Sequence, residues 1–254
     1  MTSTTTNSTT TTTTTYILYG AARSSCSWRV RSMLEHKGLK YEYRPVSLYS
    51  GEQHSAAFKA VNPAETVPAL IVETITSSTD GGGTRKSTHT LFESLAIIDY
   101  LDRVHPESTH SVYPADPIER AYAIAIAEMI VSGIQPLQNS GLMKVYVERN
   151  GGDREAALNF SQHWIETKFS QLEKLLKKLG LPDRHTIGDR PSVADICLVP
   201  QVVNAGRYRL DIDRWPLLKR LYESGLQIEG IWKARPENQV DFDPNVKSWI
   251  DSEK

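Results

Sequence analysis

Three small polar side chains, Ser24, Ser25 and Cys26, lie together where a predicted helix begins. The start of a helix carries unpaired backbone N–H groups and the positive end of the helix dipole, so it favours a bound anion. A thiolate is such an anion, and a serine hydroxyl can donate a hydrogen bond to the sulfur. These residue types therefore predict a site that holds a sulfur anion. A serine that only caps the helix is the structural alternative.

The two cysteines of the chain, Cys26 and Cys197, have different predicted roles. Cys26 could be a nucleophile that forms a mixed disulfide, or a pocket residue beside the sulfur of a bound thiol, and we favour the pocket role. No second cysteine follows three residues later, which argues against dithiol redox chemistry. Cys197 lies in an apolar run and is expected in the core. Two cysteines make no disulfide framework, so we expect a reducing, intracellular setting.

The elements around this helix start follow a β-α-β then β-β-α order. We predict strands at residues 16–19, 41–46, 67–72 and 88–92, with helices over 26–37, near 54–60 and from Ser94 onward. Three prolines mark residues 105–117 as a linker. Residues 118–254 are expected to be all-helical, with an apolar stripe from Phe169 to Leu179. The predicted class is α/β plus all-α, with one domain at 16–104 and a second at 118–254.

Two polar segments are expected to lie outside this framework. Residues 2–15 contain only Thr, Ser and Asn, eleven of the fourteen being Thr, so residues 1–15 are predicted to form a disordered tail. The stretch also lacks the basic and apolar regions of a secretory signal. Residues 76–87 are rich in Ser, Thr and Gly, and they are expected to form a long loop that turns at Asp80-Gly81.

The bulk properties exclude several classes of function. The net charge of −1 offers no support for nucleic-acid binding. No apolar run approaches the ~18 residues that a membrane span requires. The seven histidines show no metal-ligand spacing, so no metal is predicted.

The segment Ser-Ser-Cys-Ser-Trp-Arg-Val-Arg at residues 24–31 resembles the signature of the zeta-class glutathione transferases. Residues 93–100, 133–139, 195–202 and 204–207 agree with the same family, and the resemblance covers about residues 16–235. It implies a thioredoxin-like glutathione-binding domain followed by a helical bundle that supplies much of the co-substrate pocket. One departure is Gly206, beside Arg207, where the family usually has a bulkier residue.

The resemblance also implies roles for individual residues. Ser24 would hold the glutathione sulfur as a thiolate, with Ser25 and Cys26 at the same helix start. Arg23 and Arg207 would bind carboxylates of the substrate. By contrast, Asp195 is interpreted as structural, as the fourth position of a capping box that Ser192 opens. The implied glutathione-binding residues are Gln53, Val67 and Pro68 (joined by a cis peptide bond), Glu93 and Ser94.

The activity implied is glutathione-dependent cis–trans isomerisation of maleylacetoacetate to fumarylacetoacetate, a step of tyrosine and phenylalanine breakdown. Side glutathione transferase activity, a homodimer and a cytoplasmic location are implied with it. One alternative is a thioltransferase or dehydroascorbate reductase that works through Cys26. A more remote alternative is a glutathione-transferase-like binding protein without catalysis.

Overall fold

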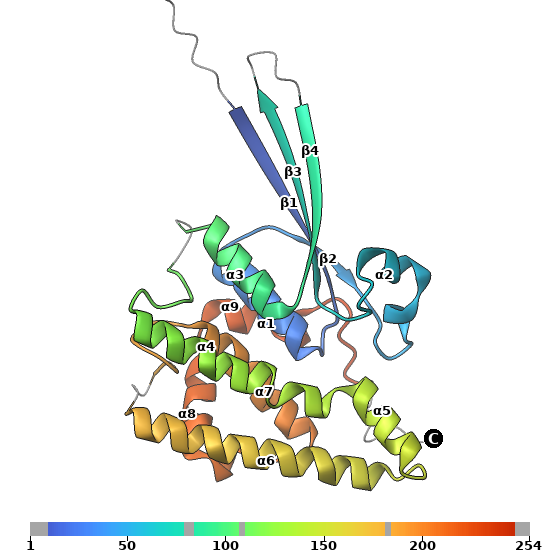
Figure 1. Ribbon diagram of the computed structural model, residues 1–254, viewed down its shortest axis with the longest axis vertical. Helices are drawn as coiled ribbons and strands as arrows, with labels where there is room; N and C mark the ends of the chain where they lie inside the picture. The colour runs from blue at the N-terminus through green and yellow to red at the C-terminus, as the bar shows by residue number, and fades with distance from the viewer. Residues whose placement is uncertain (1–9, 79–83, 107–109, 181–183, 247–254) are drawn as a thin grey trace, which may run out of the picture.

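The computed structural model describes residues 10–78, 84–106, 110–180 and 184–246 of the 254-residue chain (Figure 1). Its sheet has the strand order β2-β1-β3-β4, in which β1 is parallel to β2 and antiparallel to β3, and β4 is antiparallel to β3. The strands are β1 (Thr10–Gly20), β2 (Glu42–Pro45), β3 (Ala69–Ser78) and β4 (Thr84–Phe92). Helices α1 (Ser25–His36) and α3 (Ser94–Val104) lie on one side of the sheet and α2 (Ala56–Val61) on the other. The βαβ-ββα prediction is confirmed.

The expected disorder is wrong for residues 10–15, which form the first half of β1. Thr10 to Thr15 pair with Ser78 to Glu73 of β3, and β3 pairs in turn with β4 from Thr84. Three strands therefore extend well beyond the helices as a narrow ribbon (Figure 1). Threonine is β-branched and suits an extended chain once a neighbouring strand accepts its backbone hydrogen bonds. Residues 1–9 of the predicted tail lie outside the described residues.

The same ribbon replaces most of the loop expected at residues 76–87. Strand β3 continues to Ser78 and β4 begins at Thr84, so only residues 79–83, which lie outside the described residues, separate the two strands. Each of the two polar segments looks unstructured alone, because neither can bury a core. Their backbones pair only when both are extended together.

The second half of the chain is helical, as predicted. Helix α7 (Val193–Arg207) lies in the middle of it, is buried along almost its whole length, and packs against α1, α4 (Pro117–Val131) and α8 (Pro216–Gly225). The chain crosses from α3, which ends at Val104, to α4, which begins at Pro117. The division at residues 16–104, 105–117 and 118–254 stays a prediction. The helices are α4 (Pro117–Val131), α5 (Ser140–Arg149), α6 (Arg154–Leu179), α7 (Val193–Arg207), α8 (Pro216–Gly225) and α9 (Glu229–Lys233).

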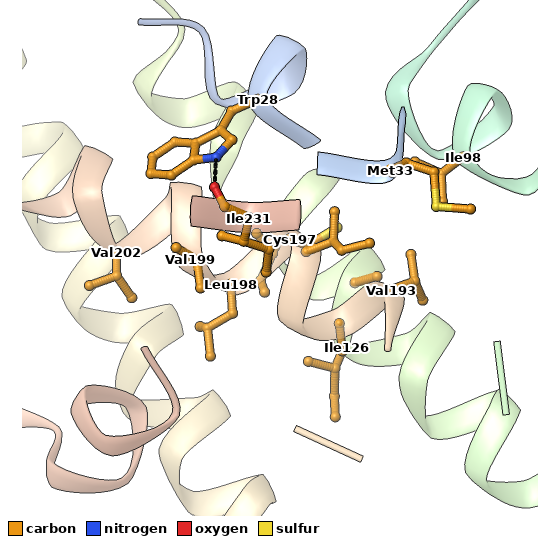
Figure 2. Packing of buried hydrophobic residues seen from close by; sticks show 14 of the residues in the cluster. Trp28, Met33, Ile98, Ile126, Val193, Cys197, Leu198, Val199, Val202 and Ile231 are labelled. Atoms are coloured by element: carbon orange, nitrogen blue, oxygen red, sulfur yellow. Dashed lines mark hydrogen bonds between the residues drawn. The ribbon is translucent and has the colours of Figure 1, made fainter. Parts of the chain in front are cut away.

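One apolar core joins the sheet-bearing part to the helical part (Figure 2). Met33 of α1 and Ile98 of α3 belong to the same buried cluster as Ile126 of α4 and Leu198 of α7. Trp28 of α1 reaches across this junction, and its Nε1 donates to the carbonyl of Ile231 in α9 at 3.0 Å. The start of α1 is therefore held by α9, which follows it by about two hundred residues.

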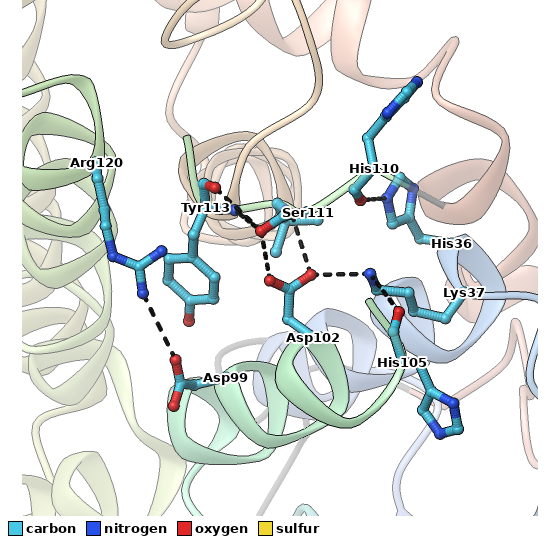
Figure 3. Close-up of polar contacts among 10 residues, drawn as sticks. His36, Lys37, Asp99, Asp102, His105, His110, Ser111, Tyr113 and Arg120 are labelled. Carbon is cyan, nitrogen blue, oxygen red and sulfur yellow. Dashed lines mark hydrogen bonds and ion pairs between the residues drawn. The ribbon is translucent and has the colours of Figure 1, made fainter. Parts of the chain in front are cut away.

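A buried polar cluster fixes the other end of α1 (Figure 3). Lys37 Nζ lies 3.0 Å from Asp102 Oδ1 and also donates to the carbonyl of His105 at 3.1 Å. Asp102 accepts further hydrogen bonds from the Ser111 hydroxyl and from the backbone N–H of Val112. These contacts tie α1 and α3 to the segment that leads into the helical domain.

Candidate active site

The loops that carry the candidate residues all leave the sheet at the same ends of its strands. Gly20 at the end of β1 pairs with Pro45 at the end of β2, and Tyr19 pairs with Ala69 at the start of β3. Ala69 also pairs with Phe92 at the end of β4. The segments after β1, after β2, before β3 and after β4 therefore start from the same edge. In that order they contain Ser24, Gln53, Val67-Pro68 and Glu93-Ser94.

Ser24 is the N-cap of α1, and its side chain accepts a hydrogen bond from the backbone N–H of Ser27 at 3.2 Å. A hydroxyl that accepts in this way keeps its own proton available for donation. Ser24 is also only partly buried, so this proton can reach a ligand. The capping role and the thiolate-holding role are thus compatible in one side chain.

Ser25 and Cys26 follow in the first turn of α1. Ser25 is buried, whereas Cys26 is partly exposed, and both cysteines are free thiols. Nη1 of Arg29, one turn along the same helix, lies 3.7 Å from Cys26 Sγ. Cys197 is fully buried as predicted, and burial raises the pKa of its thiol to about 12, which makes it unreactive at neutral pH.

The Val67-Pro68 peptide bond is cis, which confirms that prediction. Glu93 is exposed and precedes α3 with a φ of 64°, and Ser94 is the buried first residue of that helix. Nη1 of Arg29 also lies 3.4 Å from the Ser94 hydroxyl, which joins the starts of α1 and α3.

Gln53 lies in a short 3₁₀ turn (Glu52–His54) after β2. Its Nε2 contacts Nε2 of His54 at 3.0 Å, and its Oε1 is buried without a hydrogen-bond partner. Among the described residues, no hydrogen bond joins Gln53 to Ser24, Val67 or Ser94. The strand register places Gln53 at the same sheet edge, but no direct contact ties it to the other candidates.

The two candidate arginines meet directly before Ser24. Arg207, the last residue of α7, donates from Nη1 to the carbonyl of Arg23 at 2.7 Å and to Asn204 Oδ1 at 2.9 Å. Burial and the nearby Arg23 charge lower the pKa of Arg207 to about 10. The Arg207 side chain therefore remains cationic at neutral pH. The Arg207 guanidinium is held by Arg23 and Asn204, and a Cβ added at Gly206 would meet no neighbouring atom within 4 Å.

The structure adds a segment that the sequence did not connect with the site. Asp241 accepts from the backbone N–H of Ala22 at 2.8 Å, and Arg23 donates from Nη2 to the carbonyl of Asp243 at 2.8 Å. The Arg23 guanidinium also lies over the Phe242 ring, 5.0 Å from its centroid. The residues after α9 thus hold the loop that leads into Ser24. No sequence signal marks this pairing, because its partners lie more than two hundred residues apart.

Asp195 is structural, as interpreted. Its carboxylate is buried and accepts from the backbone N–H and hydroxyl of Ser192 at 2.8 and 2.9 Å. It also accepts from the backbone N–H and hydroxyl of Thr186 at 2.7 and 2.6 Å. Four hydrogen bonds occupy this carboxylate, so it is not available for proton transfer.

Known proteins resemble this chain in sequence and in fold. The glutathione S-transferase N-terminal domain family matches residues 23–104. A probable maleylacetoacetate isomerase of Drosophila melanogaster is 38% identical over 231 residues, which are 90% of this chain and 84% of that protein. The structure of maleyl pyruvate isomerase, a bacterial zeta-class enzyme, has a TM-score of 0.77 at 32% identity and covers 89% of this chain and 99% of its own. The chain belongs to the zeta-class glutathione S-transferases.

A further solved neighbour has glutathione bound in its own active site. The maleylacetoacetate isomerase of Anaeromyxobacter dehalogenans was solved with glutathione in its active site. It has a TM-score of 0.76 and 36% identity, and the match covers 91% of this chain and 99% of that one. The resemblance and the fold predicted from the sequence are thereby confirmed.

Two classes of feature are absent from the part of this zeta-class transferase that the structure describes. There, no helix is long and apolar enough to cross a membrane. In the same residues, no group of three or more His, Cys, Asp or Glu side chains is placed to hold a metal ion.

Proposed function

We propose that this protein is a glutathione-dependent cis–trans isomerase that converts maleylacetoacetate to fumarylacetoacetate, with side glutathione transferase activity. The observation that carries the proposal is the position of Ser24. Its hydroxyl proton is available at a helix start, and two cationic side chains, Arg23 and Arg207, meet at the preceding residue. A sulfur anion and a dicarboxylate can be bound side by side in such a place.

The residues at the sheet edge fit glutathione. The Ser94 hydroxyl and backbone N–H are at a helix start, where the γ-glutamyl carboxylate would bind. Glu93 is exposed beside it and would accept from the ammonium group. The backbone of Val67, before the cis Pro68, would pair with the cysteinyl part. Gln53 Oε1 is buried without a partner, and it would accept an N–H of the ligand.

Glutathione, when bound, supplies a sulfur nucleophile that adds to the carbon–carbon double bond and later leaves, so that the bond is single while it rotates. Ser24 donates its hydroxyl proton toward this sulfur and keeps it ionised, aided by the dipole of α1. Ser25 and Cys26 add their polar groups at the same helix start. Arg23 and Arg207 fix the substrate carboxylates on either side of the reacting carbon atoms.

The first experiment is isomerisation of maleylacetone, a simpler analogue of maleylacetoacetate, with and without glutathione. We expect fast turnover that requires glutathione and does not consume it. Absence of turnover, combined with reduction of dehydroascorbate or mixed disulfides, would instead support the alternative that works through Cys26.

We further propose a cytoplasmic homodimer. Its support is the exposure of large apolar side chains at the end of β4 and on α4, namely Phe92, Ile118, Tyr122 and Ile124. A groove of about 320 Å³ between α3 and α4 is lined by Leu95 and Ile124 and by the charged side chains of Asp99, Arg103, Arg120 and Glu128. Light scattering of the purified protein tests the dimer: a dimer that Ile124→Asp converts to a monomer supports an interface at this groove, and a wild-type monomer contradicts it.

A further inference from the structure

Arg29 is the most unusual charged residue near the site. It lies on α1, its side chain is fully buried, and its Nη1 faces both Cys26 Sγ at 3.7 Å and Ser94 Oγ at 3.4 Å. Its Nε and Nη2 are buried without any hydrogen-bond partner. In the described part of the chain, Arg29 forms no ion pair with a carboxylate. A buried cation in this state is costly unless an anion compensates its charge.

Arg31, two residues further along the same helix, shows what a structural arginine looks like here. It is equally buried, and its Nε donates to the carbonyl of Ala234 at 3.0 Å. Its Nη1 and Nη2 donate to the carbonyls of Ala21 and Ala22 at 3.1 and 2.9 Å. Every nitrogen of Arg31 has a protein partner, and this contrast indicates that Arg29 is not present for packing alone.

The two groups that Arg29 contacts belong to the candidate ligand site. A serine hydroxyl that accepts from a guanidinium has its own proton left to donate. The Ser94 hydroxyl, which accepts from Arg29 at the start of α3, therefore has its own proton free for a ligand. A carboxylate bound there would receive the Ser94 proton and lie one side chain away from an uncompensated positive charge.

We propose that Arg29 is a positioning residue of the glutathione site: it orients the Ser94 hydroxyl toward the γ-glutamyl carboxylate, and that carboxylate compensates the buried charge of Arg29. This inference rests on the proposed binding of glutathione. Arg29 acts through Ser94 and through its electric field, without touching the ligand. The ligand anion thus completes an ion pair that the free protein lacks.

The test measures binding of S-methylglutathione by calorimetry, because this probe has the γ-glutamyl carboxylate but no ionisable thiol. We expect Arg29→Met to raise the dissociation constant at least about tenfold, the size expected for a lost charge-assisted interaction. Arg29→Lys should recover part of the affinity. Arg29→Met should leave the melting temperature of the ligand-free protein unchanged or raised, because it removes an uncompensated buried charge.

Arg31→Met is the matched control on the same helix, and it should lower that melting temperature because three carbonyls lose their donors. A double-mutant cycle adds a second readout. Since Arg29 acts through Ser94, Arg29→Met should weaken binding less in a Ser94→Ala background than in the wild type.

Three outcomes separate the hypotheses. If the wild-type protein binds S-methylglutathione and Arg29→Met binds it with the same affinity, the role of Arg29 is overturned and the proposed function stands. The effects of Arg29→Met and Ser94→Ala on the dissociation constant could instead be fully additive, with a lowered melting temperature of ligand-free Arg29→Met. That result assigns Arg29 a structural role and also overturns the inference. Absence of S-methylglutathione binding by the wild-type protein overturns the proposed function itself.

Discussion

The two ends of α1 treat polar groups in opposite ways. At its start, the Ser24 hydroxyl keeps a free proton, Cys26 is partly exposed, and Arg29 has two buried nitrogens without partners. At its other end, the Lys37 ammonium is fully buried but is matched by Asp102 and the His105 carbonyl. One helix therefore carries an unsatisfied, open end and a satisfied, closed end.

This difference separates residues that serve function from residues that serve stability along a single helix. Buried polar groups without hydrogen-bond partners destabilise a fold, and they are retained where a ligand supplies the missing partner. Fully paired groups instead hold secondary-structure elements together. We therefore expect substitutions at the start of α1 to alter ligand binding and turnover with little loss of fold. Substitutions around its end should destabilise the protein and leave the chemistry of the folded molecules unchanged.

The largest effect is expected at the closed end. Asp102→Asn leaves the buried Lys37 ammonium without its counter-charge, and breaking a buried pair costs about 4 kcal/mol of unfolding free energy. Urea denaturation measures this loss. The control is Asp99→Asn on the same helix, because Asp99 pairs with Arg103 at an exposed site, which is worth less than about 1 kcal/mol. Equal losses in the two variants would contradict the structural role of the Lys37 cluster.

The next effect is expected at the open end. Ser24→Ala removes the donor that holds the sulfur anion, and loss of one such donor lowers kcat by about 100-fold, or about 2.7 kcal/mol. The lost N-cap costs only about 1 kcal/mol of stability, so the variant should remain folded. Ser192→Ala, at the start of α7, is the control that removes a cap away from the site. Near-normal turnover of Ser24→Ala in the maleylacetone assay would discredit its thiolate role.

Cys26→Ser should have a smaller effect. If Cys26 only lines the sulfur site, its loss should change kcat/KM for isomerisation by less than about fivefold, or about 1 kcal/mol. The same variant should be assayed for dehydroascorbate reduction. Loss of isomerisation in Cys26→Ser would move the chemistry from Ser24 to Cys26 and remove the distinction between pocket residue and nucleophile.

The smallest effect concerns pH and the closed end. Burial lowers the pKa of His36 and that of His105 below 6.5, and the Lys37 charge lowers both further. The two imidazoles therefore bind protons more readily in the unfolded chain than in the folded protein. The stability that they contribute in the neutral form is present above pH 6.5, and it is lost as the pH falls through their pKa values in the folded protein. Urea midpoints from about pH 8 to about pH 5 should fall less steeply in His36→Gln. An identical slope would exclude His36 as a source of the pH dependence.

Much of the open end can be predicted from the sequence, because its function depends on neighbouring residues. The Ser24-Ser25-Cys26 run and the Glu93-Ser94 pair lie next to predicted helix starts, and helix starts are local signals. The sequence shows Arg29 one turn after Cys26, at a spacing that puts both residues on one helix face. It does not show that Arg29 lacks partners, because whether a buried polar group finds a hydrogen-bond partner depends on the whole fold.

The closed end and the ribbon could be predicted only in part. Lys37 has the helical spacing of the apolar Val30, Met33 and Leu34, which marks a buried face, but its partner Asp102 belongs to another helix. Composition predicts disorder for the threonines at residues 10–15, because their strand pairing depends on a second segment that looks equally polar. Composition reports what a segment can bury, whereas a strand also requires an edge to pair with.

The contact of Asp241 with Ala22 joins residues 219 positions apart, and Asp243 meets Arg23 across 220. Such pairings form late, since most of the chain must be in place before they can close. During synthesis the signature leaves the ribosome well before the residues that brace it. A nascent chain that stops before Asp241 would contain every residue of the signature but would lack its support, so the working site can be completed only after Asp241 and Asp243 have been added.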